Sequence, residues 1–269
     1  EYIPQHSIRL SVIDVGQGLS VVVRTKNHHL LSETGAGNAH GFSRGTSTLV
    51  PALNALQIEY LDKVIISHGD NDHYGGLEGL KKSISINRLE ASHDSLKQPF
   101  EQCQQGDSWL WDGVRFRYLW PSHALSNKKN DRSCVLQIEA NGRTVLLTGD
   151  ISKESELALS EQYGKQLKSD IIIVPHHGSK TSSSIEFLDF VRPQIAVVSS
   201  GFQNRFKHPN LKVVERYQHR GTTVVNTADS GWIELQSSAT GWQWKLRERL
   251  DNKKYWHRPS QIVESASFE

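Results

Sequence analysis

The stretch Val64-Ile-Ile-Ser-His-Gly-Asp-Asn-Asp-His-Tyr-Gly-Gly76 decides the fold of this chain. Its first residues are β-branched and apolar, which is typical of a buried strand, and its final glycines open a helical pattern. Four side chains of metal-binding type lie between them: His68, Asp70, Asp72 and His73. Because alternate residues at a strand end point to one side, the spacing predicts that they converge on a divalent metal ion. A solvated acidic turn with two incidental histidines is the alternative, and the flanking strand and glycine pair disfavour it.

The six residues from His68 to His73 resemble the H-x-H-x-D-H signature of the metallo-β-lactamase fold, with Asp70 where most members have a second histidine. This variant is similar to that of the ComEC family, the DNA-uptake channel proteins of natural competence, whose soluble C-terminal domain has that fold. Further stretches agree: Ile13-Asp-Val-Gly-Gln-Gly18, Leu146-Leu-Thr-Gly-Asp150, Val174-Pro-His-His-Gly-Ser179 and Asn204-Arg-Phe-Lys-His-Pro209. The resemblance implies an α/β protein with a four-layer αββα sandwich.

Length and composition are those of an ordinary globular polypeptide of 269 residues, 36% apolar and 22% charged. No apolar run approaches the roughly 20 residues that cross a bilayer, and the sequence carries no signal-peptide pattern. The chain contains no methionine, so we expect a fragment or a processed product; in a ComEC protein the missing part would include the membrane channel. A net charge of +2 neither supports nor excludes a nucleic-acid partner.

Apolar alternation and helical spacing predict a single run of elements without repeats or internal linkers. Strands are expected at 8–13, 19–24, 29–33, 63–67, 88–92, 114–120, 134–139, 143–147, 169–174, 194–199 and 222–226, and helices at 46–56, 152–163 and 211–219. A closing hairpin is expected around Asp229-Ser-Gly231. We assign residues 1–240 to the metallo-β-lactamase-like domain and 241–269 to a C-terminal strand with a basic, aromatic tail.

Cysteine and tryptophan residues outside the motifs have both structural and functional interpretations. Cys103 and Cys134 match no zinc spacing, so we expect buried thiols or one disulfide. Trp109, Trp111 and Trp120 could stack on bases, but aromatic residues that alternate along strands are more often core or sheet-face residues. We therefore favour the core.

Later strand ends carry further candidate site residues. Asp150 follows a glycine after a buried strand, which suits a ligand that bridges two metal ions, although it could also cap the next helix. His176 and His177 follow another strand and could bind metal or donate a proton to the leaving oxygen of a phosphodiester. His208 competes with both for the last ligand position. The resemblance assigns Asp14 to support the ligands without binding metal.

The chain departs from the wider superfamily before the strand at 134–139, where most two-metal members carry a third-motif histidine. Only His123 lies nearby. Asn130 and Ser133 match the ComEC-like pattern instead and could hydrogen-bond a scissile phosphate or a metal-coordinated water. The first metal site, with His68 and Asp70, would then be incomplete, whereas Asp72, His73 and Asp150 could complete a second.

These residues permit metal-assisted hydrolysis, in which one or two divalent ions activate a water molecule and stabilise charge on the substrate. Carboxylate-rich ligands lean modestly toward Mn²⁺ over Zn²⁺. No small-molecule cofactor is indicated. The expected metal ligands are His68, Asp70, Asp72, His73, Asp150, His177 and His208, and the expected catalytic residues are Asp72, His176, His177, Asn130 and Ser133.

The ComEC resemblance implies a nuclease on the periplasmic side of a bacterial inner membrane that degrades the DNA strand not carried through the channel. Its partners would be single-stranded DNA, read mainly through the backbone, and the channel portion of the same polypeptide. The possible DNA contacts are Lys180, Ser179, Arg247 and Lys253. Two alternatives stay open: a stand-alone hydrolase of a small phosphodiester, thioester or lactone, and a catalytically weak DNA-guiding module.

Overall fold

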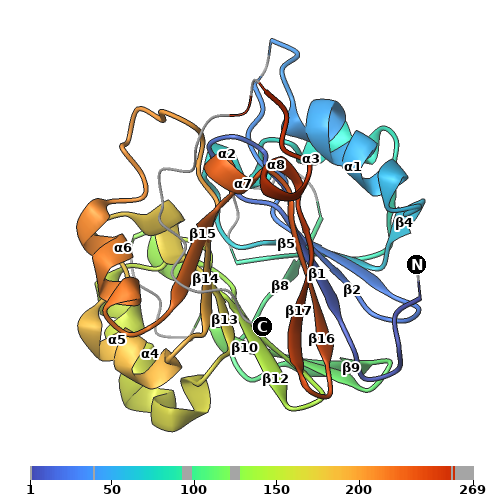
Figure 1. Ribbon diagram of the computed structural model, residues 1–269. Coiled ribbons are helices and arrows are strands. Elements are labelled where there is room, and N and C mark those ends of the chain that lie inside the picture. The colour runs from blue at the N-terminus through green and yellow to red at the C-terminus, as the bar shows by residue number, and fades with distance from the viewer. Residues whose placement is uncertain (1, 39, 93–98, 122–127, 256, 258–269) are drawn as a thin grey trace.

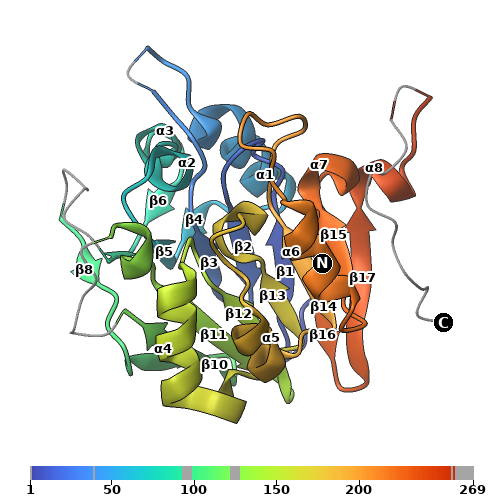
Figure 2. The ribbon, with the colours of Figure 1, turned by 90° about the vertical axis from the view of Figure 1, so that its left-hand side faces the viewer.

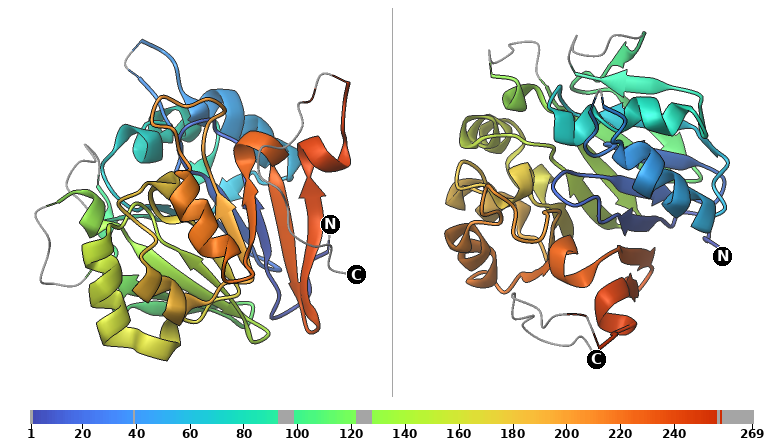
Figure 3. Two further views of the ribbon diagram at one scale, coloured as in Figure 1. Left: turned by 60° about the vertical axis from the view of Figure 1, so that its left-hand side comes forward. Right: turned by 90° about the horizontal axis from the view of Figure 1, so that it is seen from above.

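The computed structural model describes residues 2–38, 40–92, 99–121, 128–255 and 257. Two β-sheets pack face to face at the centre, and helices cover the outer face of each sheet (Figure 1). Seen from above, the helices of the two outer layers lie on opposite sides of the paired sheets (Figure 3). The predicted four-layer αββα architecture is therefore confirmed.

The first sheet has eight strands and is antiparallel at one end and parallel at the other. Its order is β17 (Gly241–Arg247), β16 (Ile233–Ser238), β1 (Arg9–Val12), β2 (Val21–Arg24), β3 (His29–Ser32), β5 (Lys63–Ile66), β7 (Leu89–Ala91) and β8 (Glu101–Gln102). The strands expected at 8–13, 19–24 and 29–33 correspond to β1 to β3, which form an antiparallel meander. Because β3, β5 and β7 are parallel, their carboxyl ends meet at one edge, where the metal motif begins.

The second sheet has seven strands. Its order is β15 (Thr223–Asn226), β14 (Ile195–Val198), β13 (Ile171–Ile173), β12 (Arg143–Leu147), β11 (Val135–Ala140), β10 (Val114–Trp120) and β9 (Ser108–Trp111). Strands β12 to β15 are parallel, so the segments that follow them also gather at one edge. A separate two-stranded sheet pairs β4 (Tyr60–Leu61) with β6 (Ser85–Ile86).

The helices form the outer layers and close the edge that carries the motifs. Over the first sheet lie the π-helical turn η1 (Gly45–Leu49), α1 (Val50–Ala55), α2 (Asn71–Tyr74) and α3 (Leu77–Lys81). Over the second lie α4 (Lys153–Tyr163), α5 (Ile185–Val191) and α6 (Leu211–Gln218) (Figure 2). The short elements are η2 (Asn130–Arg132), η3 (Gly164–Leu167), η4 (Pro175–Gly178), α7 (Thr227–Ser230) and α8 (Glu248–Asp251). Within the described ranges, no helix has the length and apolar character needed to cross a membrane.

Strand alternation divides the apolar side chains among three core layers. On β12, Leu147 points into the core between the sheets, whereas Leu146 packs with helices α4 to α6. The expected core position of the tryptophans is confirmed, since Trp109 and Trp111 pack against the central core and Trp120 is 7% exposed.

The two cysteines form a disulfide, which decides between the two alternatives left by the sequence. Cys103 follows β8 of the first sheet and Cys134 precedes β11 of the second, with their Cα atoms 6.1 Å apart. Both residues are buried in the core between the sheets. The bond therefore links the two sheets.

The predicted closing hairpin around Asp229-Ser-Gly231 is wrong. Residues 227–230 form helix α7, because the side chain of Asn226 accepts a hydrogen bond from Ala228 N and caps the helix start. The hairpin turn lies instead between Ser238 and Gly241, where β16 meets the edge strand β17. The proposed boundary at residue 240 falls within this turn. His123 lies outside the described residues.

Candidate metal centre

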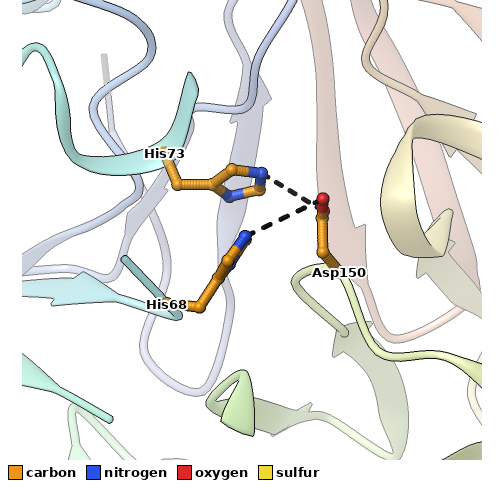
Figure 4. A group of neighbouring side chains, drawn as sticks. All are labelled: His68, His73 and Asp150. Atoms are coloured by element: carbon orange, nitrogen blue, oxygen red, sulfur yellow. Dashed lines mark ion pairs between the residues drawn. The ribbon is translucent and has the colours of Figure 1, made fainter. Parts of the chain in front are cut away.

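The metal centre forms where the carboxyl ends of strands from both sheets face one another. His68 follows β5 and His73 lies on α2, whereas Asp150 follows β12 of the second sheet. Figure 4 shows the two imidazoles approaching the carboxylate from the opposite side of the site. Asp150 therefore meets two histidines that precede it by 77 and 82 residues in the sequence. The parallel strand order predicts this meeting.

The two oxygens of the Asp150 carboxylate face different histidines. Its Oδ1 lies 3.2 Å from His73 Nε2 and 3.8 Å from His177 Nε2. Its Oδ2 lies 3.9 Å from His68 Nε2 and 3.7 Å from His176 Nε2. This two-sided geometry is what a bridging carboxylate requires.

The described donor atoms form two adjoining groups. One contains His68, His73 and Asp150, and the other contains Asp72, His73 and His177, with the ligand atoms of each group within 4.8 Å of one another. His177 Nε2 lies 3.3 Å from both Asp72 Oδ2 and His73 Nε2. Asp70 Oδ2 lies 3.7 Å from His68 Nε2, on a side chain that is 41% exposed.

The hydrogen bonding of the centre tests whether these residues fit a metal ion. His68 Nε2 and Asp150 Oδ1 are buried, and no described residue forms a hydrogen bond with either atom. Buried polar atoms are nearly always satisfied, and these two point into a group of imidazole and carboxylate donors that suits a divalent ion. The donor set therefore fits a divalent metal.

Electrostatics keep the carboxylates of the centre ionised. Burial alone would raise the pKa of Asp150, but the neighbouring His73 and His177 lower it well below its ordinary value. Burial would likewise raise the pKa of Asp72, yet His177 and His73 lower it to about 2. For Asp70 the neighbouring His68 imidazole, whose Nε2 lies 3.7 Å from Oδ2, is the main cause of a lowered pKa. Ionised carboxylates are the form that binds metal.

The Ile13–Gly18 motif supports the metal loop through its backbone. Leu19 N donates a hydrogen bond to the carbonyl of Asp72 at 3.2 Å. A Cβ atom on Gly18, whose φ is +138°, would lie only 2.6 Å from that carbonyl oxygen. Only glycine allows this close approach without displacing the loop.

Asp14 is not the supporting carboxylate that the resemblance implies. Its side chain accepts a hydrogen bond from Gly16 N at 2.9 Å and forms an ion pair with Arg249 at 2.6 Å. Among the described contacts of Asp14, none involves a candidate ligand. The turn geometry and Arg249 direct this carboxylate elsewhere, so its predicted contact with the ligands is wrong.

Glu33, which the sequence interpretation missed, occupies that supporting position. Its Oε2 lies 3.4 Å from His73 Nδ1, and its Oε1 accepts a hydrogen bond from Ser67 N at 2.9 Å. The residue is 1% exposed. The feature of the sequence that could have identified Glu33 is its position directly after β3, the strand that pairs in parallel with β5.

Ser133 has a different role from the predicted contact with phosphate or water. Its hydroxyl donates to the carbonyl of Asn130 at 2.7 Å and accepts from Asp150 N at 3.0 Å. Since Ser133 is fully buried, it positions the Asp150 backbone and cannot reach substrate. Asn130 is half-buried and borders a cavity that also contains His176.

The three late histidines occupy different positions. His177 is 3% exposed, and its Nδ1 lies 2.8 Å from the carbonyl oxygen of Ser199, which directs Nε2 toward the donors. His176 is half-buried and reaches the cavity beside Asn130. The ring of His208 lies 5.8 Å from that of His176, outside both donor groups of the described residues, and burial lowers its pKa to about 4. The geometry thus favours His177 as the ligand.

The candidate DNA contacts differ in accessibility. Lys180 is exposed beside His176 in a cavity of about 540 Å³. Ser179 is buried and its hydroxyl pairs with that of Thr181 at 2.9 Å, and its contact with DNA stays a prediction. Arg247 pairs with Asp251 at 3.2 Å, and Lys253 is exposed after α8.

Solved structures share this fold. A putative metal-dependent hydrolase from Parabacteroides distasonis matches with a TM-score of 0.55 over 84% of this chain and 96% of its own, at 14% identity. The metallo-β-lactamase fold protein YhfI from Bacillus subtilis matches with the same TM-score over 85% of this chain and 100% of its own, also at 14% identity. At this identity the similarity concerns the fold alone.

Curated relatives are similar over most of the chain. The competence protein ComA of Neisseria gonorrhoeae is 39% identical over 87% of this chain and 33% of its own length. Recombination protein 2 of Haemophilus influenzae is 34% identical over 84% of this chain and 28% of its own length. ComE operon protein 3 of Bacillus subtilis is 31% identical over 84% of this chain and 33% of its own length. These matches confirm the resemblance to the ComEC-type competence proteins, of whose length this chain spans about a third.

The family comparison agrees with the fold and with the donor geometry. The model of the metallo-beta-lactamase superfamily matches residues 13–201. That range contains the strand ends that supply His68, His73, Asp150 and His177. The chain belongs to the metallo-β-lactamase superfamily.

Proposed function

We propose that this chain is a metal-dependent nuclease domain that hydrolyses phosphodiester bonds in single-stranded DNA. The observation that carries the proposal is the Asp150 carboxylate, whose two oxygens face four imidazoles between two adjoining donor groups. Similarity to competence proteins supports DNA as the substrate. The preference for Mn²⁺ over Zn²⁺ stays part of the proposal.

Each residue of the centre has a distinct part in this function. His68 and Asp70 would hold one divalent ion, Asp72, His73 and His177 would hold a second beside it, and Asp150 would be shared between the two. Such ions supply Lewis acidity toward the phosphoryl group and lower the pKa of water. His176 faces both Asp150 and the cavity, so it can hold or transfer a proton at the substrate oxygen that leaves.

The cavity beside His176 supports an anionic substrate. The ammonium groups of Lys128, Lys153 and Lys180 border it and outnumber the described carboxylates of Asp131 and Glu154. Glu154 forms an ion pair with Lys128 at 2.9 Å. Ammonium groups attract phosphate without reading the base sequence. We therefore assign this cavity to the DNA backbone, with Lys180 as a phosphate contact and weak sequence preference as a consequence.

The cellular setting is part of the proposal. The relatives are about three times as long as the matched region, so this domain would act beside the membrane channel of a larger DNA-uptake protein. The Cys103–Cys134 disulfide supports the oxidising periplasmic side of a bacterial inner membrane. There the domain would degrade the strand that is not transported.

Hydrolysis of a labelled single-stranded oligonucleotide tests the proposal. The assay compares Mn²⁺, Zn²⁺, Mg²⁺ and a chelator, with Asp72→Asn as the test variant. Asp189→Asn is the matched control, because Asp189 of α5 is exposed and pairs with Arg220, which follows α6. We expect Mn²⁺-dependent cleavage that Asp72→Asn abolishes and Asp189→Asn retains.

Absence of cleavage in a folded, metal-binding chain would overturn the nuclease proposal. Two further readouts would then separate the alternatives. Hydrolysis of a small phosphodiester, thioester or lactone would indicate a stand-alone hydrolase. Binding of the oligonucleotide without turnover of any substrate would indicate a DNA-guiding module.

A further inference from the structure

A second cavity adjoins the metal centre through His208. Its volume is about 630 Å³, and it lies between the 201–209 loop and helices α6 and α7. His208 lines this cavity, and its ring lies 6.4 Å from that of His177 and 5.8 Å from that of His176. A group bound in the cavity would therefore be separated from the metal donors by a single imidazole ring.

The loop that forms the cavity wall is held by its own side chains. The Asn204 amide donates to the carbonyls of Gly201 at 2.9 Å and His208 at 2.6 Å, and its oxygen accepts from His208 N at 3.0 Å. Phe206 stacks on the His208 ring at 5.7 Å, with the Arg205 guanidinium 4.7 Å from the centre of the Phe206 ring. These contacts fix the shape of the loop that carries His208.

The chemistry of the wall favours a neutral, planar group. Phe202, Leu211 and Val214 supply apolar surface, and Phe202 is 41% exposed. Side-chain amides of Gln203 and Gln218 supply hydrogen-bond donors and acceptors. Among the described residues that line the cavity, the carboxylates of Glu215 and Asp229 stand beside one ammonium, from Lys207, so this lining has no cationic excess that would favour a phosphate.

We propose that this cavity binds the base of a nucleotide next to the phosphodiester that is cleaved, with Phe202 as the stacking surface. The inference rests on the proposed nuclease function, which places the sugar–phosphate backbone at the metal centre. A nucleotide is long enough to reach from that centre past His208 into the cavity. Of its base, sugar and phosphate, only the base is neutral, planar and edged with hydrogen-bonding groups. A base stacked and paired within a duplex cannot enter, so the cavity would select single-stranded DNA.

The test measures binding and Mn²⁺-dependent cleavage of a thymidine 16-mer beside a 16-mer of abasic residues with the same backbone. Wild-type protein, Phe202→Ala and Phe202→Trp are compared. Phe190→Ala is the matched control, because this residue of α5 is 37% exposed and does not line the cavity. We expect Phe202→Ala to raise Kd and KM for the thymidine oligomer about tenfold, within the range for the loss of one stacked base.

Three further results are expected: Phe202→Trp restores affinity, Phe190→Ala changes nothing, and no variant affects cleavage of the abasic oligomer. Equal wild-type cleavage of both oligomers, unchanged by Phe202→Ala, would overturn the base cavity and leave the nuclease standing. Failure of the wild type to cleave either oligomer would overturn the nuclease function and the base cavity with it. A loss of kcat on both oligomers in Phe202→Ala would show structural damage to the centre and also contradict the proposal.

Discussion

Glu33 Oε2 lies 3.4 Å from His73 Nδ1, whereas His73 Nε2 faces Asp150 at 3.2 Å. The two ring nitrogens of one histidine thus face a carboxylate on each side. A carboxylate on the outer nitrogen orients an imidazole and increases its basicity toward a metal. Burial opposes protonation of His73, but Asp150 and Glu33 raise its pKa well above the ordinary value.

The first prediction is that Glu33→Gln weakens metal binding about 10–100-fold, the usual effect of losing such a supporting carboxylate. The amide keeps an oxygen that can accept the hydrogen bond from Ser67 N. Calorimetric titration with Mn²⁺ or Zn²⁺ measures the affinity. Glu139→Gln, an exposed position on β11, is the control and should bind as the wild type does. Equal affinity in both variants would show that Glu33 does not support the ligand.

The second prediction concerns stabilisation by metal. An ion that binds only the folded protein raises the free energy of unfolding by about 4 kcal/mol at a thousandfold excess over Kd. Thermal melting with and without Mn²⁺ or Zn²⁺ should show this increase for the wild type. Asp150→Asn should abolish the increase, since Asp150 is shared by both sides of the centre, whereas Asp189→Asn should retain it. An undiminished increase in Asp150→Asn would place the metal elsewhere.

The ligand positions were predictable because the strands that carry them have strong local signals. The runs before His68, Asp150 and His177 are apolar and β-branched, and parallel strands end at a common edge. That rule alone brings the motif residues together. Local sequence was therefore sufficient to bring most of the candidate donors together, whereas the four-layer arrangement was implied by the resemblance to the metallo-β-lactamase fold.

The supporting residues depend on pairings between distant segments, which no local pattern reports. Glu33 reaches His73 only because β3 lies beside β5 in parallel. The Asp14 carboxylate is drawn to Arg249, which lies 235 residues later in the chain. Similarly, the choice between His177 and His176 depends on left-handed backbone angles, with φ of +54° and +50°, that the sequence does not display.

The third prediction concerns the disulfide between the sheets. Cys103 and Cys134 are separated by 31 residues, and closing a loop of that length stabilises a protein by about 3–4 kcal/mol through the entropy of the unfolded chain. The double variant with Cys103→Ser and Cys134→Ser should therefore unfold at a lower urea concentration. An unchanged free energy of unfolding would contradict this entropic contribution. Metal affinity should also fall, because the disulfide holds Cys134 in place and the backbone N of Cys134 donates to the carbonyl of Ser67, the residue before His68.

The fourth prediction concerns acid stability and the Asp112 carboxylate, which lies in the turn between β9 and β10. It accepts hydrogen bonds from Thr25 Oγ1 at 2.5 Å, from Asn27 N at 2.8 Å and from Asn27 Nδ2 at 2.7 Å, and it pairs with His28 at 3.1 Å. Burial alone would raise the pKa of Asp112, but these hydrogen bonds outweigh it and lower the pKa. The carboxylate therefore joins the edge of the second sheet to the loop between β2 and β3.

A lowered pKa fixes the sign of the pH dependence. The folded state binds fewer protons than the unfolded state between the two pKa values, so the contribution of Asp112 is complete above about pH 5 and is lost as the pH falls through 4 and below. Asp112→Asn should reduce the free energy of unfolding by about 1–3 kcal/mol at pH 7. The difference from wild type should shrink as urea denaturation is repeated from pH 5 down to pH 3, whereas the exposed control Asp107→Asn should show no such difference. A difference that stays constant or grows on acidification would mean that the ionised form of Asp112 is not what stabilises this junction.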